Sequence, residues 1–271
     1  MKNIPLYHVE PIRDLKEMLE KSAKTFGEKA AFLKKDVPGG PYIPVSFNQY
    51  KKDVDALGTA LIKKGCKGER IAVIGENRYE WSVSYLAVVN GTGIAVPLDK
   101  ELPVNEIVIS LNRAEVTTII FSPKLTEKIL ACKAQVPTLK HLITMAQPDP
   151  QCAEEAPYYS IYDLLREGRE LLAEGDTAFT DAVIDREAMQ ILLFTSGTTD
   201  VSKAVMLSHK NICENLMAMS SMVYIDDKDI FLSILPIHHT YECTCGFLCP
   251  VYRGSTVAYC EGLRHITKNM A

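Results

Sequence analysis

The stretch RIAVIGENRYEWSVSYLAVVNGTGIAVP, residues 70–97, decides the fold class. Its first part, residues 70–75, is a short apolar run that predicts a buried strand. Residues 79–90 predict a helix, and residues 93–97 predict a second strand. Strands that are apolar on both faces are typical of a parallel sheet with helices on each side. The strand–helix–strand order therefore predicts an α/β fold.

The segment upstream of this stretch, residues 46–65, predicts an amphipathic helix. Its apolar side chains recur at three- and four-residue steps, so they share one face of a helix. Ser46, followed three residues later by Gln49, predicts a capping box at the start. Gly65 can adopt the left-handed conformation that ends a helix. The apolar positions are Phe47, Tyr50, Val54, Leu57 and Leu61.

The downstream sequence repeats the alternation of strands and helices, so we expect mainly parallel sheets covered by helices. Residues 147–157 are rich in Pro, Glu and Ala without a period, which predicts a surface connection. We expect a first αβ subdomain over residues 1–146, a connecting segment with one helix over 147–185, and the start of a second αβ subdomain over 186–271. The expected strands are residues 117–121, 141–144, 189–195, 204–207, 230–235 and 256–259, and the expected helices are residues 104–113, 124–135, 161–173 and 210–222.

The composition is typical of an ordinary globular protein, with 47% hydrophobic residues, 24% charged residues and a formal net charge of −4. This charge gives no general attraction to nucleic acid, so no nucleic-acid partner is expected. Residues 82–98 are the most membrane-like, but polar residues interrupt them and a spanning helix needs about 20 apolar residues. The charged N-terminal region does not resemble a signal peptide, and the 8 cysteines are scattered. We therefore expect no transmembrane segment and a cytoplasmic protein with reduced thiols.

Residues 191–209, ILLFTSGTTDVSKAVMLSH, carry the clearest chemical signal. An apolar strand runs directly into a group of hydroxyl residues and a glycine, whose side chains and amides can bind a polyphosphate. A lysine further on can add a charge-assisted contact, and such loops bind ligands at the carboxyl ends of strands. The alternative is a polar turn between two strands. The residues concerned are Thr195, Ser196, Gly197, Thr198, Thr199 and Lys203.

TSGTTDVSKAVMLSH, residues 195–209, resembles the phosphate-loop signature of the adenylate-forming superfamily, which contains acyl-CoA synthetases, firefly luciferase and peptide-synthetase adenylation domains. GERIAVIGENRYEW, residues 68–81, and LAVVNGTGIAVPLD, residues 86–99, resemble that family's first strand–helix units. LPIHHTYE, residues 235–242, resembles its Leu-Pro, apolar, aromatic-His segment and is most similar to long-chain acyl-CoA synthetases. The resemblance covers residues 21–262 in the family's order.

The resemblance implies which residues bind ATP. It assigns Thr195, Ser196, Gly197, Thr198, Thr199 and Lys203 to the ATP phosphates, with Thr195 also assisting a magnesium ion. It assigns His239 a place beside the substrate carboxylate, where a donor stabilises the charge that develops during attack on the α-phosphorus. From the residues alone, a hydrogen-bonded histidine at a strand end is the favoured interpretation of His239, and the motif reverses this preference.

Two positions depart from the family pattern. Asp200 and Ala204 stand where the family usually has glycine. Aspartate tolerates left-handed backbone angles better than most residues, so the turn can be retained. The negative charge of Asp200 would, however, repel phosphates unless magnesium or Lys203 screens it. The sequence alone therefore does not decide whether Asp200 weakens the binding of ATP.

A zinc site formed by His238, His239, Cys243, Cys245 and Cys249 is a further alternative. The cysteine spacing does not follow the usual Cys-x-x-Cys pair. These cysteines also lie in an apolar stretch, where cysteine commonly acts as a small buried hydrophobic residue. We therefore favour buried thiols over zinc ligands.

The resemblance implies a ligase that converts a carboxylic acid, a fatty acid by the nearest motif, to acyl-AMP with ATP and Mg²⁺, and then to acyl-CoA with coenzyme A. Relatives of this kind are about twice as long, with an adenine-binding loop, a ribose-binding aspartate and a lid lysine beyond the position of residue 271. We therefore expect this chain to be part of a longer protein and inactive alone. Two alternatives stay open: an adenylating ligase with a carrier-protein thiol as acceptor, and a non-catalytic nucleotide-binding homologue.

Overall fold

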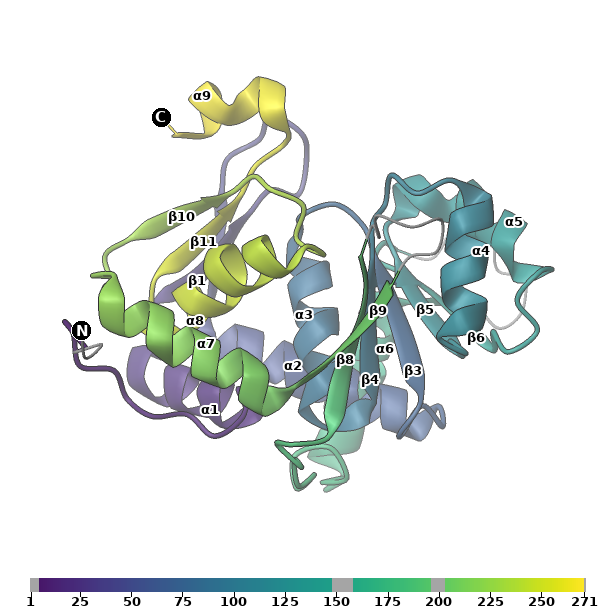
Figure 1. Ribbon diagram of the computed structural model, residues 1–271, viewed down its shortest axis with the longest axis horizontal. Helices are drawn as coiled ribbons and strands as arrows, with labels where there is room; N and C mark the ends of the chain where they lie inside the picture. Colours follow the sequence, from purple (N-terminus) through teal and green to yellow (C-terminus); the bar gives the residue numbers. More distant parts are fainter. Residues whose placement is uncertain (1–4, 148–157, 196–202, 271) are drawn as a thin grey trace.

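The computed structural model describes residues 5–147, 158–195 and 203–270, and within them the strands form two sheets (Figure 1). Every neighbouring pair is parallel except β8–β9 and β1–β2. This confirms the expected α/β fold with mainly parallel sheets. The seven-stranded sheet has the order β7 (Tyr158–Ser160), β6 (His141–Thr144), β5 (Thr118–Phe121), β3 (Arg70–Ile74), β4 (Ile94–Leu98), β8 (Met189–Thr195) and β9 (Lys203–Ser208). The four-stranded sheet has the order β10 (Ile230–Ser233), β11 (Thr256–Tyr259), β1 (Ala30–Lys34) and β2 (Ile43–Ser46).

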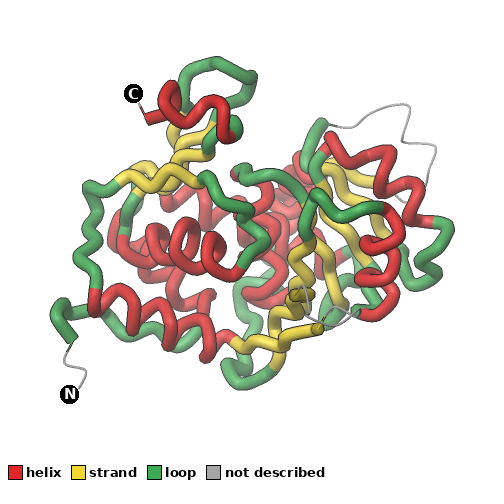
Figure 2. The backbone as a smooth tube through the Cα atoms, turned by 45° about the horizontal axis from the view of Figure 1, so that its top comes forward, coloured by secondary structure: helices red, strands yellow, loops and turns green. Residues whose placement is uncertain are grey.

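Helices lie between the sheets and on the outer face of the larger one, as the tube in Figure 2 shows. None of the helices in the described ranges is long and apolar enough to cross a membrane. The α-helices are α1 (Leu15–Phe26), α2 (Phe47–Lys63), α3 (Tyr79–Ala87), α4 (Val104–Arg113), α5 (Thr126–Lys133), α6 (Ile161–Ala173), α7 (His209–Met222), α8 (Cys249–Arg253) and α9 (Ile266–Met270). The described residues also form two π-helical segments, η1 (Val88–Thr92) and η3 (Glu242–Leu248), and two 3₁₀ segments, η2 (Pro123–Leu125) and η4 (Leu263–His265).

The apolar strand that begins the opening stretch is buried on both faces. In β3, Ile71 and Val73 join the core formed with α2, α3 and α6, whereas Ala72 and Ile74 join the core formed with α4 and α5. Successive side chains of a strand point to opposite faces, so an uninterrupted apolar run suits a strand covered on both sides.

Several predicted elements are confirmed to the residue. They are the helices Val104–Arg113 and Ile161–Ala173 and the strands His141–Thr144, Met189–Thr195 and Thr256–Tyr259. The predicted helix over residues 46–65 is present as α2, and Gly65 has the expected positive φ of 83°.

The capping box predicted at Ser46 is only half formed. Ser46 Oγ accepts a hydrogen bond from the Gln49 backbone at 3.1 Å, as predicted. The predicted return bond, from the Ser46 amide to the Gln49 side chain, is not formed. The Gln49 side chain instead donates to the buried carboxylate of Asp53, at 2.8 Å. A charged acceptor forms a stronger hydrogen bond than a neutral one and so holds the amide.

Neither sheet is confined to one of the three residue ranges expected from the sequence. Phe32 of β1 pairs with Val257 of β11, so the four-stranded sheet joins the two ends of the chain. Ala95 of β4 pairs with Ile191 of β8, so the strand before the phosphate loop belongs to the sheet of the first range.

Candidate active site at the carboxyl ends of the strands

The β8–β9 hairpin carries the predicted phosphate loop. Thr195, the last residue of β8, is the antiparallel partner of Lys203, the first residue of β9. The Thr195 hydroxyl donates to the Lys203 carbonyl at 3.5 Å, and both residues are exposed. The two strands are therefore confirmed, while Ser196, Gly197, Thr198, Thr199 and Asp200 lie outside the described residues.

Asp99 and Thr195 lie at the carboxyl ends of two neighbouring parallel strands. The register of β4 and β8 pairs Ala95 with Ile191. Asp99 comes four residues after Ala95, and Thr195 comes four residues after Ile191. Because the two strands are parallel, both side chains reach the same carboxyl edge of the seven-stranded sheet, where α/β folds bind ligands.

The two histidines arrive at this edge from the other sheet. They follow β10 of the four-stranded sheet, and His238 Nε2 lies 3.8 Å from Asp99 Oδ2. Burial lowers the pKa of His238, although the charge of Asp99 acts in the opposite direction. The lowered pKa favours the neutral form of the ring at neutral pH.

His239 is exposed, and its backbone holds it in a turn. Its amide donates to the Pro236 carbonyl at 2.9 Å. Its Nδ1 accepts from the Tyr241 amide at 3.2 Å. Because Nδ1 accepts, the neutral ring carries its proton on Nε2, which leaves Nε2–H as a donor. This is the tautomer that can donate to a carboxylate oxygen.

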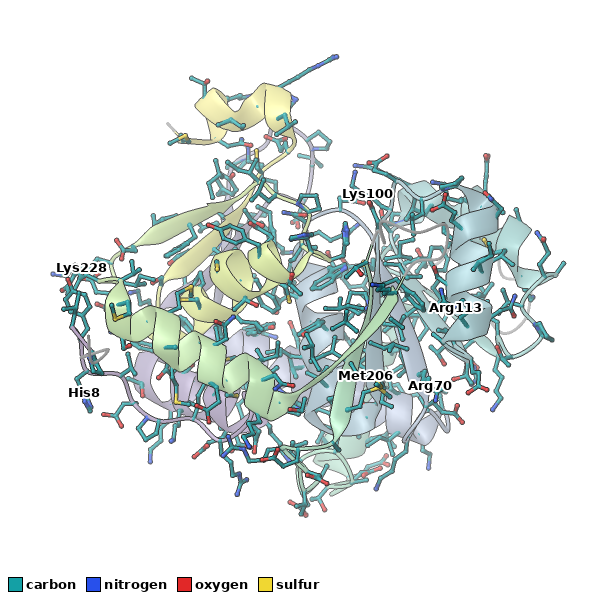
Figure 3. All side chains as sticks on the ribbon, in the orientation of Figure 1. His8, Arg70, Lys100, Arg113, Met206 and Lys228 are labelled. Carbon is teal, nitrogen blue, oxygen red and sulfur yellow. The ribbon has the colours of Figure 1, made fainter. Side chains whose placement is uncertain are left out.

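Positive charge gathers near the same edge. The Arg113 guanidinium, from the end of α4, lies 5.4 Å from the ring centre of Phe194, the residue before Thr195. Lys100 follows Asp99 directly, and Figure 3 shows it at the edge of the seven-stranded sheet. Lys100 is paired with the Glu101 carboxylate, whereas the exposed Lys203 at the start of β9 can make a charge-assisted contact with a phosphate group.

Asn77 and Asp99 are candidate site residues that the sequence reasoning did not single out. Asp99 follows directly after the end of β4, and Asn77 lies three residues after the end of β3. A polar residue just beyond an apolar strand is the signal that could have found them, because the carboxyl ends of parallel strands share one edge.

The zinc alternative finds no support in the described part of the chain. No group of three or more His, Cys, Asp or Glu side chains there is placed to hold a metal ion. Cys243 and Cys249 are buried, in η3 and α8, and Cys245 is half-buried.

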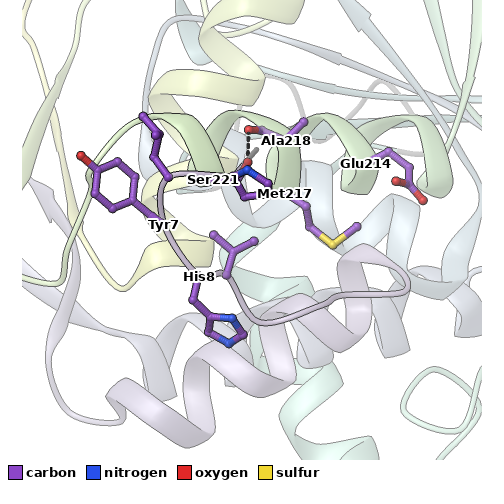
Figure 4. Close-up of a pocket in the computed structure, with 9 residues that line it drawn as sticks. Tyr7, His8, Glu214, Met217, Ala218 and Ser221 are labelled. Carbon is purple, nitrogen blue, oxygen red and sulfur yellow. Dashed lines mark hydrogen bonds between the residues drawn. The ribbon is translucent and has the colours of Figure 1, made fainter. Parts of the chain in front are cut away.

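A surface pocket of about 560 Å³ lies between the N-terminal segment and α7 (Figure 4). It is lined by residues 5–9 together with Glu214, Met217, Ala218 and Ser221. The Ser221 hydroxyl donates to the Ala218 carbonyl of its own helix, at 2.8 Å. None of the predicted site residues lines this pocket, so it does not belong to the candidate site.

Comparisons with known proteins agree with the fold and the motifs. Residues 19–270 match the family model described as AMP-binding enzyme. The chain is 29% identical over 234 residues to fatty acyl-CoA synthetase A of Dictyostelium discoideum, covering 83% of the chain and 33% of that protein. It is 26% identical over 231 residues to the chloroplastic long-chain-fatty-acid–[acyl-carrier-protein] ligase AEE15 of Arabidopsis thaliana, covering 82% of the chain and 32% of that protein.

The fold also matches the crystal structure of the anthranilate CoA ligase AuaEII in complex with anthranoyl-AMP. The TM-score is 0.80 at 20% identity, over 100% of this chain and 48% of that one. The chain spans about a third of the length of the two curated relatives described above. The family model covers nearly all of the chain, which confirms the resemblance drawn from the phosphate-loop and His-His motifs: the chain belongs to the AMP-binding enzyme family.

Proposed function

We propose that the protein containing this chain activates a fatty acid with ATP to acyl-AMP and then transfers the acyl group to coenzyme A. One observation carries the proposal. The ends of the phosphate-loop strands and the His238–His239 segment come from different sheets, yet both lie at the carboxyl edge marked by Asp99.

In the first step, a carboxylate oxygen attacks the α-phosphorus of ATP and pyrophosphate leaves. Lys203 and residues 195–199 bind the phosphates, and Nε2–H of His239 donates to the carboxylate as its charge shifts. The exposed hydroxyl of Thr195 is a hard oxygen donor, so it suits the magnesium ion that accompanies ATP. The contribution of these groups is mainly positioning and charge stabilisation.

In the second step, the thiol of coenzyme A attacks the acyl carbonyl and AMP leaves. The acid is proposed to be a fatty acid because the Dictyostelium relative is named a fatty acyl-CoA synthetase. A carrier-protein thiol is the second candidate acceptor, because the Arabidopsis relative is named an acyl-carrier-protein ligase. We also propose that residues 1–271 alone do not complete the reaction.

The decisive experiment measures exchange of labelled pyrophosphate into ATP by the full-length protein, with and without a panel of fatty acids. We expect exchange that depends on the acid and falls about 100- to 1000-fold in His239→Ala, the usual cost of losing a preorganised donor. Supplying coenzyme A or a phosphopantetheinyl carrier protein then shows which thiol is acylated. Absence of exchange with every acid would contradict the proposal and favour the non-catalytic homologue.

A further inference from the structure

Asn77 forms hydrogen bonds from one sheet to the other. It lies three residues after the end of β3, in the seven-stranded sheet. Its Nδ2 donates to Ser233 Oγ at 2.8 Å and to the Leu235 carbonyl at 2.6 Å. Its Oδ1 accepts from the Ile237 amide at 3.0 Å. One half-buried side chain thus binds the end of β10 and the turn that leads to the two histidines.

Ser233 extends these bonds into the interior. Its hydroxyl donates to Glu242 Oε1 at 2.7 Å. Glu242 is 5% exposed, and burial raises the pKa of its carboxyl group, although the bond from Ser233 opposes the shift. A side chain at Gly246 would overlap this carboxylate. Bonds from Asn77 and Glu242 therefore hold both ends of the His238–His239 segment.

We propose that Asn77 is a positioning residue that sets where His239 lies relative to Thr195 and Lys203. Asn77 is anchored to the sheet that carries Thr195, whereas His239 follows a strand of the other sheet. Without the three bonds, the histidine turn would keep, among the described residues, one polar contact with the larger sheet, the 3.8 Å approach of His238 to Asp99, together with the burial of Ile237 in the shared core. The catalytic consequence rests on the proposed function, but the mechanical connection does not.

The bonds require an amide. Two partners are reached by N–H donors and one by a carbonyl acceptor, and only asparagine offers both at this length. In Asn77→Asp, a carboxylate oxygen would face the Leu235 carbonyl, so two acceptors would repel each other. Asn77→Asp therefore loses the two bonds that the amide donates, with almost no change in side-chain volume, but can still accept from Ile237, while Asn77→Ala removes all three bonds.

The first measurement is amide hydrogen–deuterium exchange of residues 234–242 in the full-length protein. We expect faster exchange in Asn77→Asp and Asn77→Ala. The matched control is Asn211→Ala, which removes an asparagine that bonds to Ser208 in the capping box of α7. The control should leave exchange of residues 234–242 unchanged. Unaltered exchange in both Asn77 variants would overturn the proposal, whatever the protein catalyses.

The second measurement is acid-dependent pyrophosphate exchange. We expect Asn77→Asp to lower kcat about 100-fold with little change in KM for ATP, because misplacing a group by about 1 Å can cost this much. Combined with His239→Ala, it should add almost nothing, because both changes remove the same contribution. Full additivity would show that Asn77 acts independently of His239 and would overturn the positioning role. Wild-type protein without exchange would refute the proposed function, and the deuterium measurement would still decide the connection.

Discussion

Lys203 begins β9 directly opposite Thr195, and it is exposed. We expect Lys203→Ala to lower kcat/KM for ATP in the full-length protein. Loss of one charge-assisted phosphate contact costs about 1.5–3 kcal/mol, or roughly 10- to 150-fold. The control is Lys228→Ala, which removes the same charge far from the hairpin (Figure 3). Equal kinetics for the two variants would remove Lys203 from the site.

His209 makes folding stability depend on pH. It is fully buried, its Nδ1 accepts from the Leu15 amide at 3.0 Å, and its Nε2 donates to the Val89 carbonyl at 2.9 Å. Burial lowers its pKa below the usual 6.5, although the bond to Val89 and the nearby Asp14 oppose the shift. The unfolded chain therefore binds the proton more readily, so the stability present above pH 6.5 is lost as the pH falls.

We expect the free energy of unfolding to decrease below pH 6.5 by up to about 1.4 kcal/mol per pH unit from this group. In His209→Asn, the side-chain oxygen can still accept from Leu15 and cannot titrate, so this variant should be less stable at pH 8 but less sensitive to acid. Urea denaturation at pH 8 and pH 5.5 measures both quantities. His265→Asn, at an exposed histidine, should retain the wild-type pH dependence.

At the scale of elements, local signals predicted most helices and the buried parallel strands. The helix α1 was missed although its signal is present: Asp14 caps it, and Leu15, Met18 and Leu19 share its buried face. The strand β1 has no such signal. Its buried Phe32 pairs with Val257, and no local pattern identifies a partner so far along the chain.

The packing of α2 against α6 depends on one glycine. A side chain at Gly168 would overlap the backbone carbonyl of Ala56. In an exposed helix, Gly→Ala would stabilise by about 1 kcal/mol. Here we expect Gly168→Ala to destabilise the fold by about 1–3 kcal/mol, because the helices must separate.

Thermal or urea denaturation measures this effect, with Glu170→Ala, on the exposed side of the same helix, as the control. A Gly168→Ala variant as stable as the wild type would show that the two helices can move apart without cost.

At the scale of the whole molecule, the sequence predicted the segments of the candidate site better than the contacts between them. The phosphate-loop strands and the His-His segment were each recognised from their own residues. The contact of His238 with Asp99 and the bonds of Asn77 to Ser233 and Ile237 were not. They depend on how the two sheets face each other, which short-range patterns do not encode.

We expect the 271-residue chain to fold by itself but not to form acyl-AMP. Two buried cores close within the described residues, whereas the chain spans about a third of the curated relatives. Loss of a single preorganised electrostatic contact from an active site can lower the rate about 100- to 1000-fold. The purified chain is incubated with ATP, magnesium and fatty acids, and acyl-AMP is trapped with hydroxylamine. Formation of hydroxamate above the level of a His239→Ala control would contradict this expectation, because it would show that residues 1–271 contain a complete active site.

The pairing of β1 with β11 sets a waiting time during protein synthesis. Val257 leaves the ribosome about 225 residues after its partner Phe32, which takes roughly 10–45 s at about 5–20 residues per second. Until then β1 can pair only with β2, and a two-stranded hairpin is marginal in water. The nascent chain therefore presents an open edge of β1 until Val257 emerges, although Tyr50 and Tyr79, which contact Phe32, are made much earlier. We expect a ribosome-associated chaperone to bind at this open edge during that interval.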